Sequence, residues 1–188
     1  MKTHYLVKEI IISEEQIQKC VAELATEIKV YYQNIEQPLV LIGILRGCLP
    51  FFSDFMMKLD MECAVEFMYV ESYAGQTATV IEPRIKFDLF GDIKGRDVVV
   101  VEDIIDSGKT LVKLIDHLKQ KQPKSIKILT LLDKKSKRMA PIAADWFGFE
   151  VPDHFLVGYG LDYQEILRNL PFVAVADLDK IKALENKS

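Results

Sequence analysis

Residues 98–110 decide the fold, and they read Val98-Val99-Val100-Val101-Glu102-Asp103-Ile104-Ile105-Asp106-Ser107-Gly108-Lys109-Thr110. A continuous run of β-branched residues is typical of a strand that is buried on both faces of a parallel sheet. In open α/β sheets, ligands bind beyond the carboxyl ends of such strands. The run therefore predicts a central strand over 97–101 that delivers Glu102, Asp103 and Asp106 to a ligand site.

The segment after these acids has the composition of an anion-binding helix start. Asp106 or Ser107 can cap a helix over 110–121, and Gly108 lets the backbone approach a bulky anion closely. Free N–H groups at a helix start, together with the helix dipole, favour phosphate. Carboxylates on one side and phosphate-binding amides on the other suit a sugar phosphate, with hydroxyls or a magnesium ion facing Glu102 and Asp103.

Two other interpretations of this stretch are weaker. A solvated acidic turn would account for a bare pair of acids, but not for the valine run, the spaced acids and the helix start together. Gly108-Lys109-Thr110 matches the last three residues of a P-loop, which would suggest a nucleotide hydrolase. The first P-loop glycine would then fall at Asp103, where a carboxylate would repel a triphosphate.

Other segments predict strands that alternate with helices, and hence a parallel α/β core. A helix begins at Ser13, which can form a capping box with Gln16, and a loop over 71–79 has the composition of a lid. Right-handed crossovers would bring the ends of several strands to one edge, so that Arg46, the acids and Lys134 meet. The remaining predicted elements are strands over 39–45, 61–70, 84–90 and 126–132 and a helix over 50–59.

The length of the chain and the positions of its turn residues predict a single domain over 1–188, with a core over about 35–145. The last third is aromatic and broken into short segments, so we expect a small hood built from about 1–12 and 146–188. A basic cluster over 133–138 is equally consistent with a solvated loop and with a loop that supplies one ligand-binding lysine.

Composition limits the function classes. The formal net charge of −4 argues against a protein that grips nucleic acid backbone. The three cysteines are scattered and the three histidines have no ligand spacing, so a zinc site is not expected. We find no signal peptide and no apolar run long enough to span a bilayer, and therefore expect a cytoplasmic protein without membrane partners.

The 98–110 stretch closely resembles the phosphoribosyl-pyrophosphate loop of the type I phosphoribosyltransferases, in the form found in the hypoxanthine-guanine phosphoribosyltransferases. The resemblance covers about residues 5–178, and its fold would be that family's: a mainly parallel sheet flanked by helices, with a hood from both ends of the chain. Other segments agree in order, namely Leu45-Arg46-Gly47, Glu71-Ser72-Tyr73, Leu131-Leu132-Asp133-Lys134, 148–153 and 157–163.

The resemblance implies a magnesium-dependent enzyme of purine salvage. It would join hypoxanthine, and guanine, to phosphoribosyl pyrophosphate and give IMP, or GMP, and pyrophosphate. Glu102 and Asp103 would hold the ribose hydroxyls and the metal, Asp162 would be a further metal ligand, and Asp106 would be the general base for the purine. Because the breaking bond leaves an oxocarbenium-like sugar, charge stabilisation and exclusion of water should dominate the catalysis.

The same resemblance assigns the phosphate contacts. Arg46 and Gly47 resemble the pyrophosphate loop, whose Leu45–Arg46 peptide is commonly cis in the family, and Arg168 resembles a further pyrophosphate contact. The family often has lysine at the position of Arg46, and arginine should serve because the binding is largely through backbone. The substrate-binding residues implied around the 5′-phosphate are Ile105, Asp106, Ser107, Gly108, Lys109, Thr110 and Leu111.

The purine contacts follow in the same way. Phe155 resembles the aromatic residue that stacks on the base, the Leu156 backbone would meet its Watson–Crick edge, and Lys134 would donate to its exocyclic oxygen. Adenine would present an amino group to Lys134, so it should be rejected. Ser72 and Tyr73 resemble the lid that closes over the reaction.

A regulatory protein that senses phosphoribosyl pyrophosphate is the alternative from another functional class. Such a protein would normally lose the base pocket or gain a basic face for nucleic acid. This chain keeps Lys134, Phe155 and Asp162 and is acidic, which favours the enzyme. Relatives are usually dimers or tetramers, so a homodimer or homotetramer is expected, and the choice among hypoxanthine, guanine and xanthine stays open.

Overall fold

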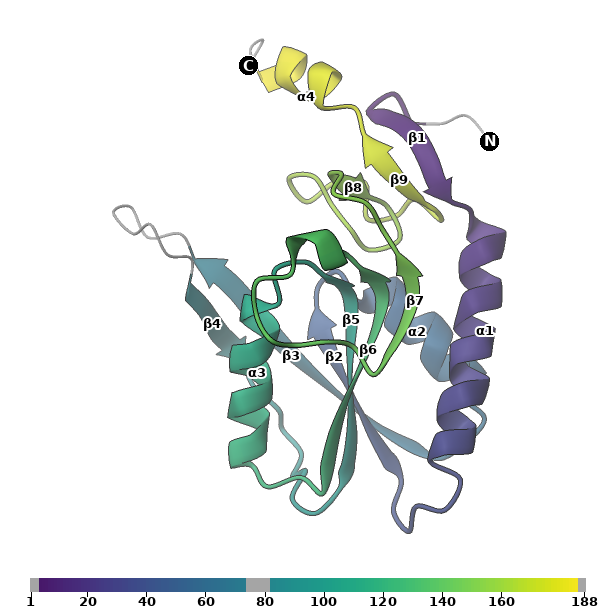
Figure 1. The fold of residues 1–188 in the computed structure, drawn as a ribbon, viewed down its shortest axis with the longest axis vertical. Coiled ribbons are helices and arrows are strands. Elements are labelled where there is room, and N and C mark those ends of the chain that lie inside the picture. Colours follow the sequence, from purple (N-terminus) through teal and green to yellow (C-terminus); the bar gives the residue numbers. More distant parts are fainter. Residues whose placement is uncertain (1–3, 74–81, 186–188) are drawn as a thin grey trace.

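The computed structural model describes residues 4–73 and 82–185, in which a large sheet carries a smaller one at one end (Figure 1). The strands are β1 (Val7–Ile12), β2 (Leu39–Leu45), β3 (Cys63–Tyr73), β4 (Glu82–Phe87), β5 (Asp97–Ile105), β6 (Ser125–Asp133), β7 (Trp146–Glu150), β8 (Leu156–Val157) and β9 (Val173–Ala176). The helices are α1 (Glu14–Tyr31), α2 (Leu49–Lys58), α3 (Lys109–Gln120) and α4 (Leu178–Glu185), with a 3₁₀ turn over Lys135–Lys137.

The large sheet confirms the predicted α/β class. Its strand order is β4-β3-β2-β5-β6-β7, and every neighbouring pair is parallel except β3 with β4. The predicted strand over 39–45 is β2 itself. In contrast, β5 continues four residues beyond the predicted end, because Glu102, Ile104 and Ile105 still pair with β6. The acids therefore lie within the last part of the strand rather than after it.

The valine run is buried on both faces, as predicted. Val99 and Val101 pack in the cluster that includes α1 and α2, whereas Val98 and Val100 pack in the cluster that includes α3. Figure 1 shows α1 and α3 on opposite sides of the sheet. Because strand side chains alternate between faces, one run of four valines joins both layers of the core.

Helix α1 begins as predicted. The Ser13 hydroxyl accepts from the Gln16 backbone N–H at 3.3 Å, and the Gln16 side chain accepts from the Ser13 N–H at 2.8 Å. At the end of α1, Tyr31 is 57% exposed, whereas Tyr32 is buried in the core. Trp146 of β7 packs edge-on against Tyr31.

The hood comprises the three-stranded sheet β1-β9-β8 and α4 (Figure 1). It has its own apolar cluster, which includes Leu6, Val157 and Phe172. The expected hood boundary at residue 146 is wrong, since β7 pairs in parallel with β6 and belongs to the large sheet. Within 4–73 and 82–185, the helices lack the length and apolar composition needed to cross a membrane.

Candidate active site

The turn from β5 into α3 lines a cavity of about 120 Å³. Gly108 occupies the N-cap position with φ of +78°, and no side chain caps the helix. The expectation that Asp106 or Ser107 caps it is therefore wrong, although the Ser107 hydroxyl accepts weakly from the Lys109 N–H at 3.4 Å. Lys109 is exposed and does not line this cavity. The lining consists of Glu102, Ile104, Ile105, Asp106, Ser107, Gly108, Thr110 and Leu111.

Glu102 and Asp103 lie beside a second cavity, of about 440 Å³, at the carboxyl ends of β2 and β5. Burial raises the pKa of Asp103 to about 6, and the positive charge of Arg168 lowers it. Burial and the charge of Asp103 raise the pKa of Glu102 as well. These two half-buried carboxylates fit a divalent cation, because a positive charge beside them would offset the cost of their ionisation. Magnesium commonly takes one or two carboxylates from a protein. Within the described ranges, no group of three or more His, Cys, Asp or Glu side chains is arranged to hold a metal ion.

The same cavity brings together the predicted pyrophosphate contacts. Arg46, Gly47 and Arg168 line it, and the Leu45–Arg46 peptide is cis, as the resemblance implied. A Cβ atom at Gly47 would lie 1.6 Å from the Asp103 Oδ2 atom. Only glycine therefore lets the turn after β2 come this close to the acids.

A carboxylate that the sequence did not single out links the two arginines of this cavity. Glu165 accepts from both ends of the Arg46 guanidinium, at 2.8 and 3.2 Å, and from Arg168 at 3.3 Å. Arg168 also pairs with Asp162 at 2.8 Å and donates to the Gly160 carbonyl at 2.8 Å. No local motif marks Glu165 as a link between the two arginines, since Arg168 is three residues away but Arg46 lies on a turn 119 residues away.

A third cavity, of about 210 Å³, brings together the residues predicted to bind the base. Lys134 is buried at the end of β6, where its ammonium donates to the His154 carbonyl at 3.1 Å and lies 3.6 Å from the Asp106 Oδ2 atom. Phe155 is 44% exposed, so its ring is available for stacking. The lining is Asp103, Ile104, Asp106, Lys134, Phe155, Leu156, Leu161 and Asp162.

The lid prediction falls largely outside the described residues. Ser72 and Tyr73 belong to β3, where their backbones pair with Pro83 and Glu82 of β4. Residues 74–81, which contain most of the expected lid, are not described.

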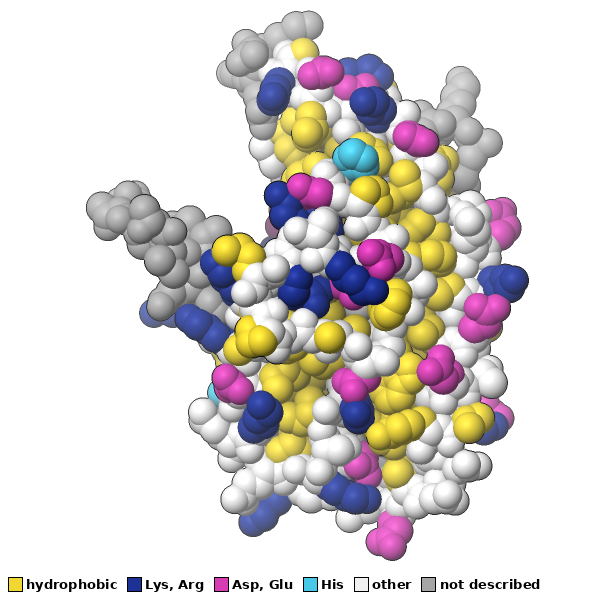
Figure 2. Space-filling view, viewed as in Figure 1, with side chains coloured by type: hydrophobic (Ala, Val, Ile, Leu, Met, Phe, Trp, Pro, Cys, Tyr) yellow, Lys and Arg dark blue, Asp and Glu magenta, His cyan; other side chains and the backbone are white. Residues whose placement is uncertain are grey.

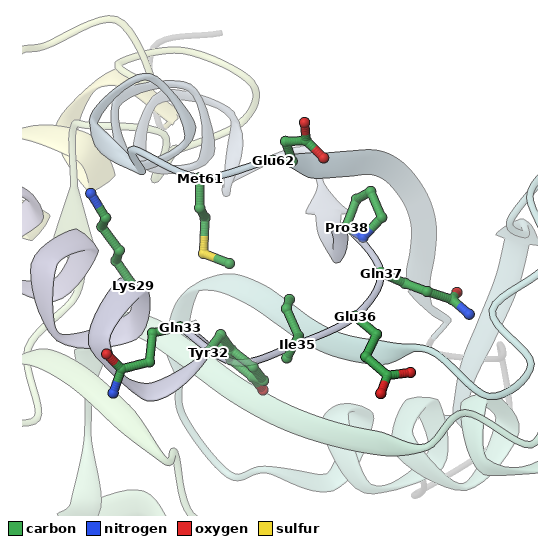
Figure 3. Close-up of a pocket in the computed structure, with 9 residues that line it drawn as sticks. All are labelled: Lys29, Tyr32, Gln33, Ile35, Glu36, Gln37, Pro38, Met61 and Glu62. Carbon is green, nitrogen blue, oxygen red and sulfur yellow. The ribbon is translucent and has the colours of Figure 1, made fainter.

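A separate pocket of about 280 Å³ lies at the amino end of β2, at the other end of that strand from these three cavities. Figure 3 shows Met61 and Ile35 extending into it, while Glu36 and Gln37 point away. None of the site residues predicted from the sequence line this pocket.

The large sheet is mainly parallel, and its strands end at an acidic pair, a glycine-capped helix start and a cis peptide turn. This arrangement defines an α/β protein of the phosphoribosyltransferase class. The family model for the phosphoribosyl transferase domain matches residues 11–164. The hypoxanthine-guanine phosphoribosyltransferase of Bacillus subtilis is 49% identical over 169 residues, which are 90% of this chain and 93% of the relative. The chain belongs to the hypoxanthine-guanine phosphoribosyltransferase family.

Solved structures agree with this assignment. The crystal structure of a hypoxanthine phosphoribosyltransferase from Staphylococcus aureus superposes with a TM-score of 0.88 at 39% identity, covering 94% of this chain and 95% of that one. A mutant of the Trypanosoma cruzi hypoxanthine phosphoribosyltransferase, complexed with the product IMP, has a TM-score of 0.88 at 32% identity, covering 100% and 94% of the two chains.

Proposed function

We propose that this phosphoribosyltransferase transfers the ribose 5-phosphate group of phosphoribosyl pyrophosphate to hypoxanthine and guanine. The products are IMP or GMP and pyrophosphate. The observation that carries the proposal is the meeting of three adjoining cavities at the ends of β2, β5 and β6. Glu102 lines the first and second cavities, Asp103 the second and third, and Asp106 the first and third.

The three cavities match the three parts of the reaction. The 5′-phosphate would bind at the turn into α3, pyrophosphate between Arg46 and Arg168, and the purine between Phe155 and Lys134. A bond forms between a purine ring nitrogen and the anomeric carbon, and the bond from that carbon to pyrophosphate breaks. Asp106, whose carboxylate is 53% exposed at the shared wall, would take the proton that the imidazole ring loses.

We propose that magnesium is required, with Glu102 and Asp103 holding it together with substrate oxygens. Bound magnesium would neutralise charge on the pyrophosphate leaving group. Both oxygens of Asp162 already have partners, since one pairs with Arg168 at 2.8 Å and the other accepts from the Glu165 N–H at 2.8 Å, so a metal would have to share them. Mutating Asp162 should therefore weaken the metal dependence less than mutating Asp103.

Lys134 accounts for the expected preference among bases. Its ammonium has donors only, so it would pair with the exocyclic oxygen of hypoxanthine, guanine or xanthine and would face another donor in adenine. The chemistry of Lys134 does not rank the three oxopurines.

The test is to measure pyrophosphate release with hypoxanthine, guanine, xanthine and adenine, each with and without magnesium. We expect release with hypoxanthine and guanine in magnesium alone and none with adenine. Release with adenine would overturn the role of Lys134. Binding of phosphoribosyl pyrophosphate without release for any base would favour the sensor function instead.

We further propose a cytoplasmic homodimer or homotetramer. The three thiols Cys20, Cys48 and Cys63 are unpaired, which supports a reducing compartment. Light scattering of the purified protein would test the assembly state.

A further inference from the structure

The basic cluster after β6 contains an arginine that does not behave as a surface charge. Figure 2 shows basic side chains gathered on the face near this loop. Arg138 differs from Lys135 and Lys137, which are exposed, because its side chain is only 15% exposed and pairs with the buried carboxylate of Asp133. Lys135, by comparison, is half exposed and pairs with Glu150 on the surface. The burial and pairing of Arg138 are therefore not those of a solvated surface charge.

The remaining donors of Arg138 are bound to backbone carbonyls. Its Nε atom donates to the Asp106 carbonyl at 3.1 Å, and its Nη2 atom donates to the Ile105 carbonyl at 3.3 Å. Its Nη1 atom donates to the Ile142 carbonyl at 2.6 Å. A single guanidinium thus joins its own loop to the turn between β5 and α3.

The residues next to Arg138 extend this attachment. The Met139 and Ala140 N–H groups both donate to the Ser107 carbonyl, at 3.0 and 3.1 Å. Three successive carbonyls of the turn, those of residues 105–107, are therefore held by residues 138–140. The two segments pack closely, since a Cβ atom at Gly108 would lie 2.6 Å from the Ile142 Cγ2 atom and 3.1 Å from the Arg138 Cδ atom.

The geometry of the peptide bond determines the direction in which the N–H groups of this turn point. In a trans peptide, the C=O of one residue and the N–H of the next point in opposite directions. Carbonyls 105–107 point to the Arg138 segment, so the N–H groups of Asp106, Ser107 and Gly108 point away from it. The cavity of about 120 Å³ is lined by these residues and by none of 138–142.

We propose that Arg138 is a positioning residue, which turns the N–H groups of 106–108 toward the 5′-phosphate of the substrate. The inference rests on the proposed function for the identity of the ligand. Arginine suits the role because its planar fork reaches several acceptors at once, whereas the ammonium of lysine is a single point. Since Asp133 precedes Lys134, the same ion pair joins the phosphate turn to the end of β6 that carries the base contact.

The experiment compares Arg138→Lys with the unaltered protein by isothermal titration with two ligands. Ribose 5-phosphate probes the turn, and inorganic pyrophosphate with magnesium probes the cavity of Arg46 and Arg168. We expect Arg138→Lys to weaken ribose 5-phosphate binding about tenfold, as the loss of charged hydrogen bonds predicts, and to change pyrophosphate binding less than about threefold. The matched control, Lys135→Ala, removes a neighbouring cation that does not touch the turn and should change neither.

A second variant tests whether the guanidinium itself is needed. In Arg138→Ala, millimolar guanidinium should restore part of the ribose 5-phosphate affinity, which a merely structural loss would not allow. Unchanged ribose 5-phosphate binding in Arg138→Lys, or an equal loss for both ligands, would overturn the proposal. An unaltered protein that does not bind ribose 5-phosphate would overturn it too. An unaltered protein that binds ribose 5-phosphate but forms no nucleotide from phosphoribosyl pyrophosphate and any purine would refute the proposed function and leave the role of Arg138 standing.

Discussion

The three acids Glu102, Asp103 and Asp106, at the end of β5 and just after it, differ in their surroundings, although they are close in sequence. Glu102 and Asp103 are partly covered and have raised pKa values because of burial. Asp106 is exposed and faces Lys134 across 3.6 Å. At the scale of single residues, this difference separates a pair suited to holding a cation from an exposed carboxylate at the edge of the proposed purine cavity.

We expect Asp106→Asn to lower turnover with hypoxanthine by about two orders of magnitude or more, because an amide cannot take the proton of the base. The fold and substrate binding should persist, since the side chain keeps its size and is exposed. Steady-state kinetics and thermal unfolding check both points. Asp153→Asn, which removes a surface partner of Lys137, is the control and should not change turnover. Unchanged turnover in Asp106→Asn would refute the assignment of the base.

Two connections between elements meet at the cavity of Arg46 and Arg168. The turn after β2 and the loop over 158–168 meet at the Glu165 carboxylate, which bridges Arg46 and Arg168. Gly160 packs so closely on this turn that a Cβ atom there would lie 1.9 Å from the Gly47 carbonyl oxygen. The two proposed pyrophosphate contacts are therefore ion-paired to one shared carboxylate.

Glu165→Gln should strengthen pyrophosphate binding by about two- to fivefold, because the arginines would no longer have to break ion pairs with a carboxylate. The gain is small because exposed ion pairs are weak. Isothermal titration in magnesium measures the change. Glu150→Gln removes a comparable surface pair with Lys135 and should have no effect. Weaker binding would mean that Glu165 orients the arginines rather than competing for them.

A second connection attaches α3 to the end of β4 through Asp88. Burial raises the pKa of Asp88, but hydrogen bonds from Lys121, from the Leu89 N–H and from His117 outweigh it, so the pKa falls below 3.8. A lowered folded-state pKa contributes stability above the unfolded value and loses it as the pH falls through the folded value. Asp88→Asn should cost less than about 1 kcal/mol at pH 7, since the group is a third exposed, and less again at acidic pH, below the folded-state pKa of Asp88. Denaturant unfolding at both pH values tests this, and a constant difference would contradict it.

At the scale of the whole molecule, the site lies between the large sheet and the hood. The large sheet has apolar clusters on its two faces, one of which also includes Ile12, Leu156 and Val173 of the hood, and the hood has a third cluster of its own. The phosphate turn and Lys134 belong to the large sheet, while Leu156 belongs to the hood sheet, and Phe155, Asp162 and Arg168 come from the segments around it. A nucleotide in the three cavities would therefore contact the large sheet and the hood at once.

Binding of IMP should slow amide hydrogen exchange in β8 and β9 as well as in 102–111, because a ligand that binds only the assembled site stabilises both the large sheet and the hood. Inosine lacks the 5′-phosphate and should protect both regions less. Exchange measured by mass spectrometry would show the pattern. Protection confined to 102–111 would indicate that the hood does not take part in nucleotide binding.

The sequence by itself determined the features that depend on local patterns. The four valines predicted a doubly buried strand, Ser13 and Gln16 predicted a helix start, and the strand ends marked Arg46, the acids and Lys134. Each signal lies within a few residues, and the chemistry of those residues restricts the conformations they can adopt.

Only the tertiary structure decided the rest, because its causes are contacts between distant segments. Pairing with β6 extends β5 through the acids, and β7 joins the large sheet through the same strand. Glu165 and Arg138 acquire their roles from turns 119 and 32 residues away. Such residues belong to no periodic sequence pattern, so their partners can be identified only in the folded structure, where the distant segments are in contact.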